Sequence, residues 1–187
     1  TDQTPQGAGD AFAVCLKPDG SRLWFWQWSG GGTAADGVSD LALAPGGTNL
    51  WVGGTWAKSG GSDTDGMVRR IKASDGNTIT NWTLAGNPGD TNAADVASSV
   101  TRVCAASNDV AVAWEAGSAR SVRRLGATSW WQGRSNGAIG GLWGDAQGNV
   151  VVREAGGDNR GRVSVLGPAT GEELWSQAGS YTYWDDP

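Results

Sequence analysis

The feature that most constrains the fold is a hairpin-like pattern that recurs four times along the chain. Each copy is an alternating apolar and polar run ending in Leu or Ile, a short turn, and a second run that carries tryptophan. The copies are residues 11–24, 66–82, 121–131 and 162–175. Their turns, such as KPDG, ASDG and ATG, contain the proline, aspartate and glycine that tight hairpins need. The pattern therefore predicts repeated antiparallel hairpins.

A second hairpin pattern follows each of the first three copies. It covers residues 40–54, 100–114 and 139–154, each with a Gly- or Asn-containing turn between two alternating runs. A first and a second hairpin together predict a four-stranded antiparallel meander. Tandem meanders of this length are typical of β-propeller blades, so the predicted fold class is all-β, a propeller-like array of four-stranded blades.

The repeats predict about three and a half blades. The predicted boundaries are an N-terminal segment at 1–9, complete blades at 10–60, 61–118 and 119–157, and a partial fourth blade at 158–187. A closed ring usually needs about four to eight blades. We therefore expect an open arc with exposed sheet edges, either part of a larger propeller or completed by a neighbouring copy.

The stretch DAFAVCLKPDGSRLWFWQW, a Gly/Asp loop and then VSDLALAPGGTNLWVGGTW resemble the bacterial-type β-propeller repeat of large secreted and surface proteins. LGPATGEELW, in the last unit, is also similar to the quinoprotein-type propeller repeat, whose usual form is Asp-x-x-Thr-Gly-x-x-x-Trp. The resemblance spans about residues 10–175 and implies a fold. It implies little chemistry, because such propellers serve many functions.

Composition and charge narrow the choice of partners. The chain has 187 residues with 14 basic and 19 acidic side chains, a net charge of −5 and a pI near 4.6. Nucleic acid and anionic membrane surfaces favour basic proteins, so neither is expected as a partner. No apolar run approaches the roughly 20 residues that span a bilayer. The chain starts at Thr1 without a signal-like segment, which indicates a processed product or an excerpt of something longer.

Two further features favour an extracellular location. Asn81 begins an N-glycosylation sequon, Asn81-Trp82-Thr83. Cys15 and Cys104 could form one disulfide in an oxidising compartment. The alternative is two unpaired buried thiols in neighbouring strands.

Twelve tryptophans stand out in a chain with two phenylalanines and two tyrosines. In RLWFWQW, alternation places three indoles on one face of a strand. A recurrent set on second strands is expected to pack between blades: Trp24, Trp82, Trp130 and Trp175. A set outside this register could stack on a ligand such as a sugar: Trp28, Trp56, Trp131 and Trp184.

Charged motifs are read mainly as structural. Arginine pairs at 69–70 and 123–124 could hold a carboxylate or sulfated glycan, but they more readily neutralise nearby aspartates. The stretch SDTDG (62–66) does not complete a calcium loop, because Lys72 stands where the required glutamate would be. Asp36 and Asp95 are expected to bind backbone amides in their loops. No metal site is predicted.

Nothing in the sequence points to catalysis. There is no histidine and no phosphate-binding loop, and carboxylate pairs lie at turns or at the terminus. We therefore expect a non-enzymatic, extracellular structural or adhesive module without cofactor. It would associate with itself, as in a fibre, or with other extracellular proteins through open sheet edges. The alternative is a carbohydrate-binding propeller with glycan partners; a third hypothesis is a fragment of a quinoprotein-like enzyme.

Overall fold

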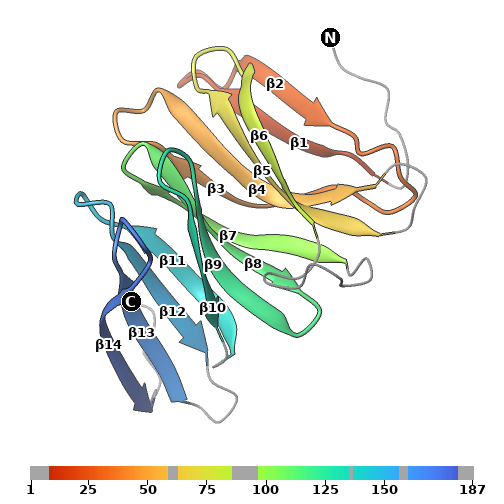
Figure 1. The fold of residues 1–187 in the computed structure, drawn as a ribbon. Helices are drawn as coiled ribbons and strands as arrows, with labels where there is room; N and C mark the ends of the chain where they lie inside the picture. Colours follow the sequence, from red (N-terminus) through yellow and green to blue (C-terminus); the bar gives the residue numbers. More distant parts are fainter. Residues whose placement is uncertain (1–8, 59–62, 86–96, 135–136, 156–159, 181–187) are drawn as a thin grey trace.

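The computed structural model describes residues 9–58, 63–85, 97–134, 137–155 and 160–180 (Figure 1). Within these ranges the regular structure consists of fourteen β-strands that form four antiparallel sheets. The sheets follow one another around an arc, from the N-terminal sheet at one end to the C-terminal sheet at the other. None of the described segments is a helix of the length and apolarity needed to cross a bilayer.

The first sheet has two strands, β1 (Ala11–Leu16) and β2 (Arg22–Trp28). Its register places Trp28, Trp26 and Trp24 opposite three small residues, Ala11, Ala13 and Cys15. Because side chains alternate along a strand, the three indoles share one face, and all three are buried. The row of tryptophans is therefore a packing layer of the sheet, as predicted for Trp24, and it includes Trp28, from the set expected to stack on a ligand.

The other three sheets each have four strands in meander order. The second sheet is β3 (Gly37–Leu43), β4 (Asn49–Ala57), β5 (Thr64–Lys72) and β6 (Thr78–Leu84). The third sheet is β7 (Ser98–Ala106), β8 (Asp109–Ala116), β9 (Ala119–Leu125) and β10 (Trp130–Arg134). The fourth sheet is β11 (Ala138–Gly144), β12 (Val150–Ala155), β13 (Arg160–Leu166) and β14 (Glu173–Ser180).

The predicted blade boundaries are displaced from these sheets by one hairpin. β4 pairs with β5 along its whole length, from Asn49 opposite Lys72 to Ala57 opposite Thr64, so the predicted boundary at 60/61 cuts through a sheet. The boundaries at 118/119 and 157/158 do the same. A tandem repeat fixes the period of the meanders but not the strand at which each sheet begins. The half-complete sheet consequently lies at the N-terminus, and the sheet at the C-terminus has four strands.

The core lies between successive sheets in three layers. The three tryptophans of β2 pack against Val52, Met67 and Ile71 of the second sheet. Separate apolar clusters fill the space between the second and third sheets and between the third and fourth sheets. Each internal sheet is thus covered on both faces, which is the packing that stacked blades require.

Asp36 fixes the connection that crosses from the first sheet to the second. Its carboxylate accepts the backbone N–H of Gly30 at 2.7 Å and that of Ala57 at 2.6 Å. The expected role of Asp36 as a ligand of loop amides is confirmed, whereas Asp95 lies outside the described residues.

Candidate functional site

A repeated tryptophan contact joins neighbouring sheets. Trp24 of the first sheet donates its indole N–H to the carbonyl of Ala73, in the β5–β6 turn of the second sheet, at 2.8 Å. Its ring covers Gly76, where a Cβ would come within 2.9 Å of the indole. Gly76 has φ of +75°, a conformation that glycine adopts readily. The turn therefore supplies a carbonyl that accepts the indole N–H and a glycine on which the ring packs.

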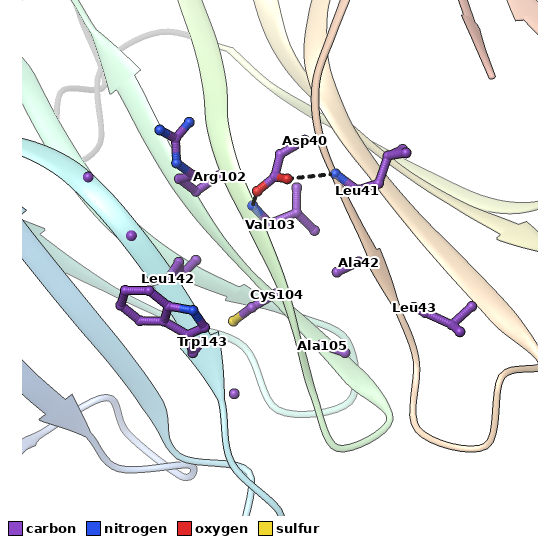
Figure 2. A pocket seen from close by; sticks show the side chains of 13 residues that line it. Asp40, Leu41, Ala42, Leu43, Arg102, Val103, Cys104, Ala105, Leu142 and Trp143 are labelled. Atoms are coloured by element: carbon purple, nitrogen blue, oxygen red, sulfur yellow. Dashed lines mark hydrogen bonds between the residues drawn. The ribbon is translucent and has the colours of Figure 1, made fainter. Parts of the chain in front are cut away.

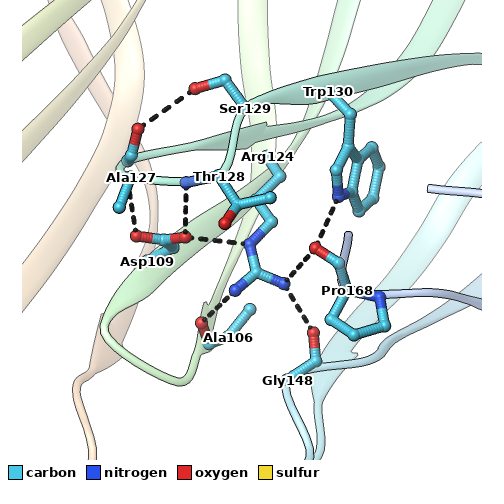
Figure 3. A network of polar contacts seen from close by, with 10 residues as sticks. Ala106, Asp109, Arg124, Ala127, Thr128, Ser129, Trp130, Gly148 and Pro168 are labelled. Carbon is cyan, nitrogen blue, oxygen red and sulfur yellow. Dashed lines mark hydrogen bonds and ion pairs between the residues drawn. The ribbon is translucent and has the colours of Figure 1, made fainter. Parts of the chain in front are cut away.

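Trp130 makes the same contact between the third and fourth sheets. Its indole N–H donates to the carbonyl of Pro168 at 3.2 Å, in the β13–β14 turn (Figure 3). A Cβ at Gly171, with φ of +73°, would lie 2.5 Å from the indole. In both cases a tryptophan of one sheet packs on the turn of the next sheet along the chain.

One member of the predicted packing set, Trp82, packs in the layer between the second and third sheets as predicted, but it is not at the register position of the others. Trp24, Trp130 and Trp175 oppose the residue that precedes Leu16, Leu125 and Leu166, respectively. In the second sheet the equivalent of these leucines is Ile71, and the residue opposite Arg70, which precedes it, is Thr80. Trp82 lies two residues further on and corresponds to Trp26. It is half-buried and packs against Trp51, with ring centroids 5.6 Å apart.

Trp175 corresponds in register to Trp24 and Trp130, but it is not buried. Its exposed fraction is 52%, against 8% for each of the other two. The prediction that Trp175 packs between blades is therefore not met within one chain. The reason is positional: Trp24 and Trp130 each contact the following sheet, and no described sheet follows the fourth.

The outer face of the fourth sheet is an apolar row that crosses all four strands: Trp143, Val151, Val165 and Trp175. Trp143 is about half exposed, like Trp175. The residues at the position of Val151 in the second and third sheets, Trp51 and Ala111, are fully buried against the next sheet. We call this row the C-terminal end face.

The outer face of the first sheet is apolar as well. It carries Phe12, Val14, Leu16 and Leu23, all exposed by 45% or more, and Phe25. In the other three sheets, the residues at the position of Leu16 are Ile71, Leu125 and Leu166, and each is buried against the preceding sheet. We call this surface the N-terminal end face. Both ends of the arc thus expose apolar side chains whose counterparts are buried at internal junctions, with the exception of the exposed Thr80 at the position of Trp175 in the second sheet.

The described tryptophans of the set predicted to stack on a ligand differ in their exposure. Trp28 is buried, and the Arg69 guanidinium lies 5.1 Å from its ring and 5.2 Å from that of Trp26. Trp56 is half-buried beside Gly30. Trp131 in β10 is exposed, and Trp184 lies outside the described residues. Burial thus excludes a ligand role for Trp28. Of the described tryptophans in this set, Trp131 is the exposed one.

The arginine pairs serve different contacts. Arg124 is buried and binds the Asp109 carboxylate, as predicted for neutralisation of an aspartate. Its guanidinium also donates to the carbonyls of Ala106, Gly148 and Pro168 (Figure 3). Burial lowers the pKa of Arg69 from its ordinary value, and the Asp36 charge opposes that shift.

Arg70 lies over the ring of Trp51, 5.3 Å from its centroid. Arg123, next to Arg124 in β9, is half-buried and stands opposite Trp131 in the strand pairing.

The two cysteines are unpaired, so the predicted disulfide is wrong. Cys15 is in β1 and Cys104 in β7, and these strands belong to sheets separated by the whole second sheet. Cys104 is buried in the layer between the third and fourth sheets. Burial raises its pKa to about 12.

The remaining polar predictions fall on accessible or paired groups. Asn81 is exposed in β6, the outermost strand of the second sheet, so the sequon is accessible. Asp65, from the rejected calcium motif, forms an ion pair with Lys58 at 3.3 Å. Among the described residues, no three His, Cys, Asp or Glu side chains lie together as a metal site would need.

A buried ion pair between the third and fourth sheets was not foreseen from the sequence. Arg134 donates to Glu154 at 2.6 Å and to the Ser164 hydroxyl at 2.8 Å, and all three groups are almost fully buried. Glu173 extends the cluster toward solvent. These residues occupy ordinary strand positions, and no spacing in the sequence distinguishes them from solvated charges.

The first strands of the three complete sheets line an open groove of about 490 Å³ (Figure 2). Its wall consists of segments of β3, β7 and β11, with Leu41, Leu43 and Trp143 exposed along it. Asp40 accepts the N–H of Val103 at 2.9 Å and holds β7 beside β3. This groove is the concave inner side of the arc.

Stacked four-stranded meanders, arranged around a concave wall and joined by tryptophan contacts, define an arc of a β-propeller. Among solved structures, the chain is similar to BamB from Moraxella catarrhalis, with a TM-score of 0.53 and 17% identity. The match covers 92% of this chain and 44% of that chain, so this chain spans less than half the length of the solved protein. No family model and no curated protein matches the chain. At this identity the likeness shows the fold alone.

Proposed function

We propose that this chain is a non-enzymatic structural module, an arc of a β-propeller that assembles with copies of itself outside the cell. The observation that carries the proposal is the exposure of apolar blade-packing faces at both ends of the arc. Monomeric proteins rarely leave contiguous apolar surface of this kind without a partner.

Three observations support the parts of this proposal that concern chemistry and location. The sequence has no histidine, and its most buried charged pairs, Arg124–Asp109 and Arg134–Glu154, are used to join sheets. Asn81 is exposed for glycosylation. The repeats resemble those of secreted and surface propellers. Together these favour an adhesive or assembly role at a cell surface over catalysis.

The experiment is a measurement of mass by light scattering and sedimentation across a range of concentrations, followed by negative-stain electron microscopy. We expect species heavier than the 19.2 kDa chain, visible as rings or fibres. A mass of one chain at every concentration would reject the assembly role.

A glycan-binding function is the second candidate, favoured by the exposed ring of Trp131 in β10. Stacking on a sugar would change indole fluorescence, and the change would be lost in Trp131→Ala. A glycan array without any response, together with self-association, would reject this candidate and retain the first.

A further inference from the structure

We propose that two copies dock head to tail, with the C-terminal end face of one copy on the N-terminal end face of the next. In this contact Trp175 packs on the β1–β2 turn of the second copy. The inference rests on the proposed assembly function and specifies its interface.

The direction of the contact follows from the junctions inside the chain. Trp24 reaches from the first sheet to the second, and Trp130 reaches from the third to the fourth. In both, the tryptophan belongs to the earlier sheet and the turn to the later one. The junction between the second and third sheets lacks this contact, because Thr80 holds the position of the tryptophan. Trp175 matches Trp24 and Trp130, so we place it on the turn of a following sheet, and we assign the turn of the first sheet to a tryptophan from a preceding one.

The β1–β2 turn has no described tryptophan packed on its glycine, unlike the β5–β6 and β13–β14 turns, which we call the occupied turns. Gly20 has φ of +82°, close to the +75° of Gly76 and the +73° of Gly171. A Cβ at Gly76 or Gly171 would collide with an indole, whereas none of the described residues lies within 4 Å of the same point at Gly20. The β1–β2 turn is one residue shorter than the occupied turns, because the Gly20 N–H donates to the carbonyl three residues before it and those of Gly76 and Gly171 donate four residues back. It shares with them a glycine of positive φ, and it is open where their tryptophan lies.

The turn also offers the matching acceptor. In the occupied turns, the N–H of Lys72 or Gly167 closes the hairpin, and the next residue, Ala73 or Pro168, accepts the indole N–H. In the first sheet the N–H of Lys17 closes the hairpin by donating to Ser21 at 2.8 Å, and the next residue is Pro18. We assign the exposed carbonyl of Pro18 as the acceptor for Trp175.

The surfaces around this contact are complementary in kind. The C-terminal end face presents a row of two tryptophans and two valines, and the N-terminal end face presents Phe, Val and Leu side chains. An apolar cluster fills each internal junction, although Arg70 and Arg124 hold the position of Val165 in the second and third sheets. Packing the two end faces would form such a cluster between copies.

A second copy fits the size of a propeller. Two copies bring eight sheets, counting the two-stranded ones, and closed propellers typically have about four to eight blades. Two copies also approach the length of the BamB chain, of which one copy spans 44%. Because the interface joins different surfaces of the two partners, it closes into a ring if the rotation per copy permits and otherwise extends into a filament.

The test uses one variant at each end and a matched control for each. Trp175→Ala removes the indole from the C-terminal end face, and Trp131→Ala removes an equally exposed indole from β10. Leu16→Glu places a charge on the N-terminal end face, and Leu41→Glu places the same charge on an exposed leucine of the inner groove. All four side chains are about half exposed, so far-UV circular dichroism and urea midpoints should stay near those of the original chain.

Sedimentation equilibrium gives the expected results. Trp175→Ala and Leu16→Glu should each weaken association about 30-fold or more, as truncation of a central interface tryptophan does. Both control variants should associate like the original chain. Mixing Trp175→Ala with Leu16→Glu should restore a dimer, because the first retains an intact N-terminal face and the second an intact C-terminal face.

Other outcomes overturn the inference and remain distinguishable from failure of the proposed function. If the original chain associates but Trp175→Ala has no effect, or if the mixture stays monomeric, the head-to-tail contact is wrong while the assembly role stands. If the original chain is monomeric throughout, the assembly role fails as well.

Discussion

Arg124 and Asp109 form an ion pair across 3.0 Å within the third sheet, and the guanidinium extends beyond that sheet to two turns of the fourth. Asp109 also accepts the N–H groups of Ala127 and Thr128, which shapes the β9–β10 turn (Figure 3). One buried pair therefore fixes a turn and connects two sheets.

Replacing Arg124 with methionine should lower the free energy of unfolding by about 3–5 kcal/mol, because the Asp109 carboxylate would remain buried without its cation. Urea denaturation measures the change. The adjacent Arg123→Met is the control and should cost less than about 1 kcal/mol, since Arg123 is half-buried and makes none of these contacts. Equal losses in the two variants would contradict the assigned role of Arg124.

Two glycine variants test the packing of Trp130 on the β13–β14 turn. Gly171 and Gly46 both have positive φ, but a Cβ at Gly171 meets Trp130, whereas one at Gly46 meets no described residue within 4 Å. Gly46→Ala should cost about 1–2 kcal/mol from backbone strain alone. Gly171→Ala should cost a further 1–3 kcal/mol, roughly, from collision with the indole. If urea denaturation gave equal losses in the free energy of unfolding for the two variants, the Trp130 ring would not pack on the turn.

The repeating hairpins could be predicted from the sequence, but the strand at which each sheet begins could not. Turn residues and alternation mark each hairpin, and the row Trp24, Trp26 and Trp28 is buried as its spacing indicates. Which hairpins share a sheet depends on the pairing of β4 with β5, and a tandem repeat is compatible with either grouping.

The predicted packing positions of single tryptophans could not all be obtained from the sequence either. The repeat aligns Trp82 with Trp24 because each is a tryptophan of a second strand, but the strand pairing places Trp82 opposite Val68 and Thr80 opposite Arg70, at the position of Trp24. The exposure of Trp175 follows from where the arc ends in space, and no local pattern encodes it. The inner groove could not be predicted either, because it depends on three sheets lying side by side.

The thiol of Cys104 should resist alkylation in the folded chain. Its pKa of about 12, raised by burial, leaves little thiolate at pH 8, and the thiolate is the reactive species. With iodoacetamide, we expect Cys104 to react at least about a hundredfold more slowly than in urea. Mass spectrometry of the labelled peptides measures this. A Cys15–Cys104 disulfide recovered by non-reducing peptide mapping would refute the free-thiol state.

Stability should decrease in acid partly through Glu173. The Ser176 hydroxyl, and then the Arg162 charge, hold the pKa of Glu173 below its ordinary value of 4.5. A carboxyl with a lowered folded-state pKa contributes stability above its unfolded pKa and loses it as pH falls through the folded value.

The free energy of unfolding should therefore fall as pH decreases from about 5 to about 3, and Glu173→Gln should reduce that slope. Ser176→Ala should reduce it as well, because it removes the largest contribution to the shift. Urea midpoints at the two pH values provide the measurement. An unchanged slope in Glu173→Gln would show that this carboxyl does not contribute.

The most direct test of the complementary ends is site-specific crosslinking. Trp175 is replaced by a photoreactive phenylalanine analogue in a ¹⁵N-labelled chain, which is then mixed with unlabelled original chain and irradiated. We predict a crosslink from the labelled position 175 to an unlabelled peptide containing the turn at 17–20. Crosslinks confined to the labelled copy itself, or to a different surface of the unlabelled copy, would contradict the head-to-tail contact.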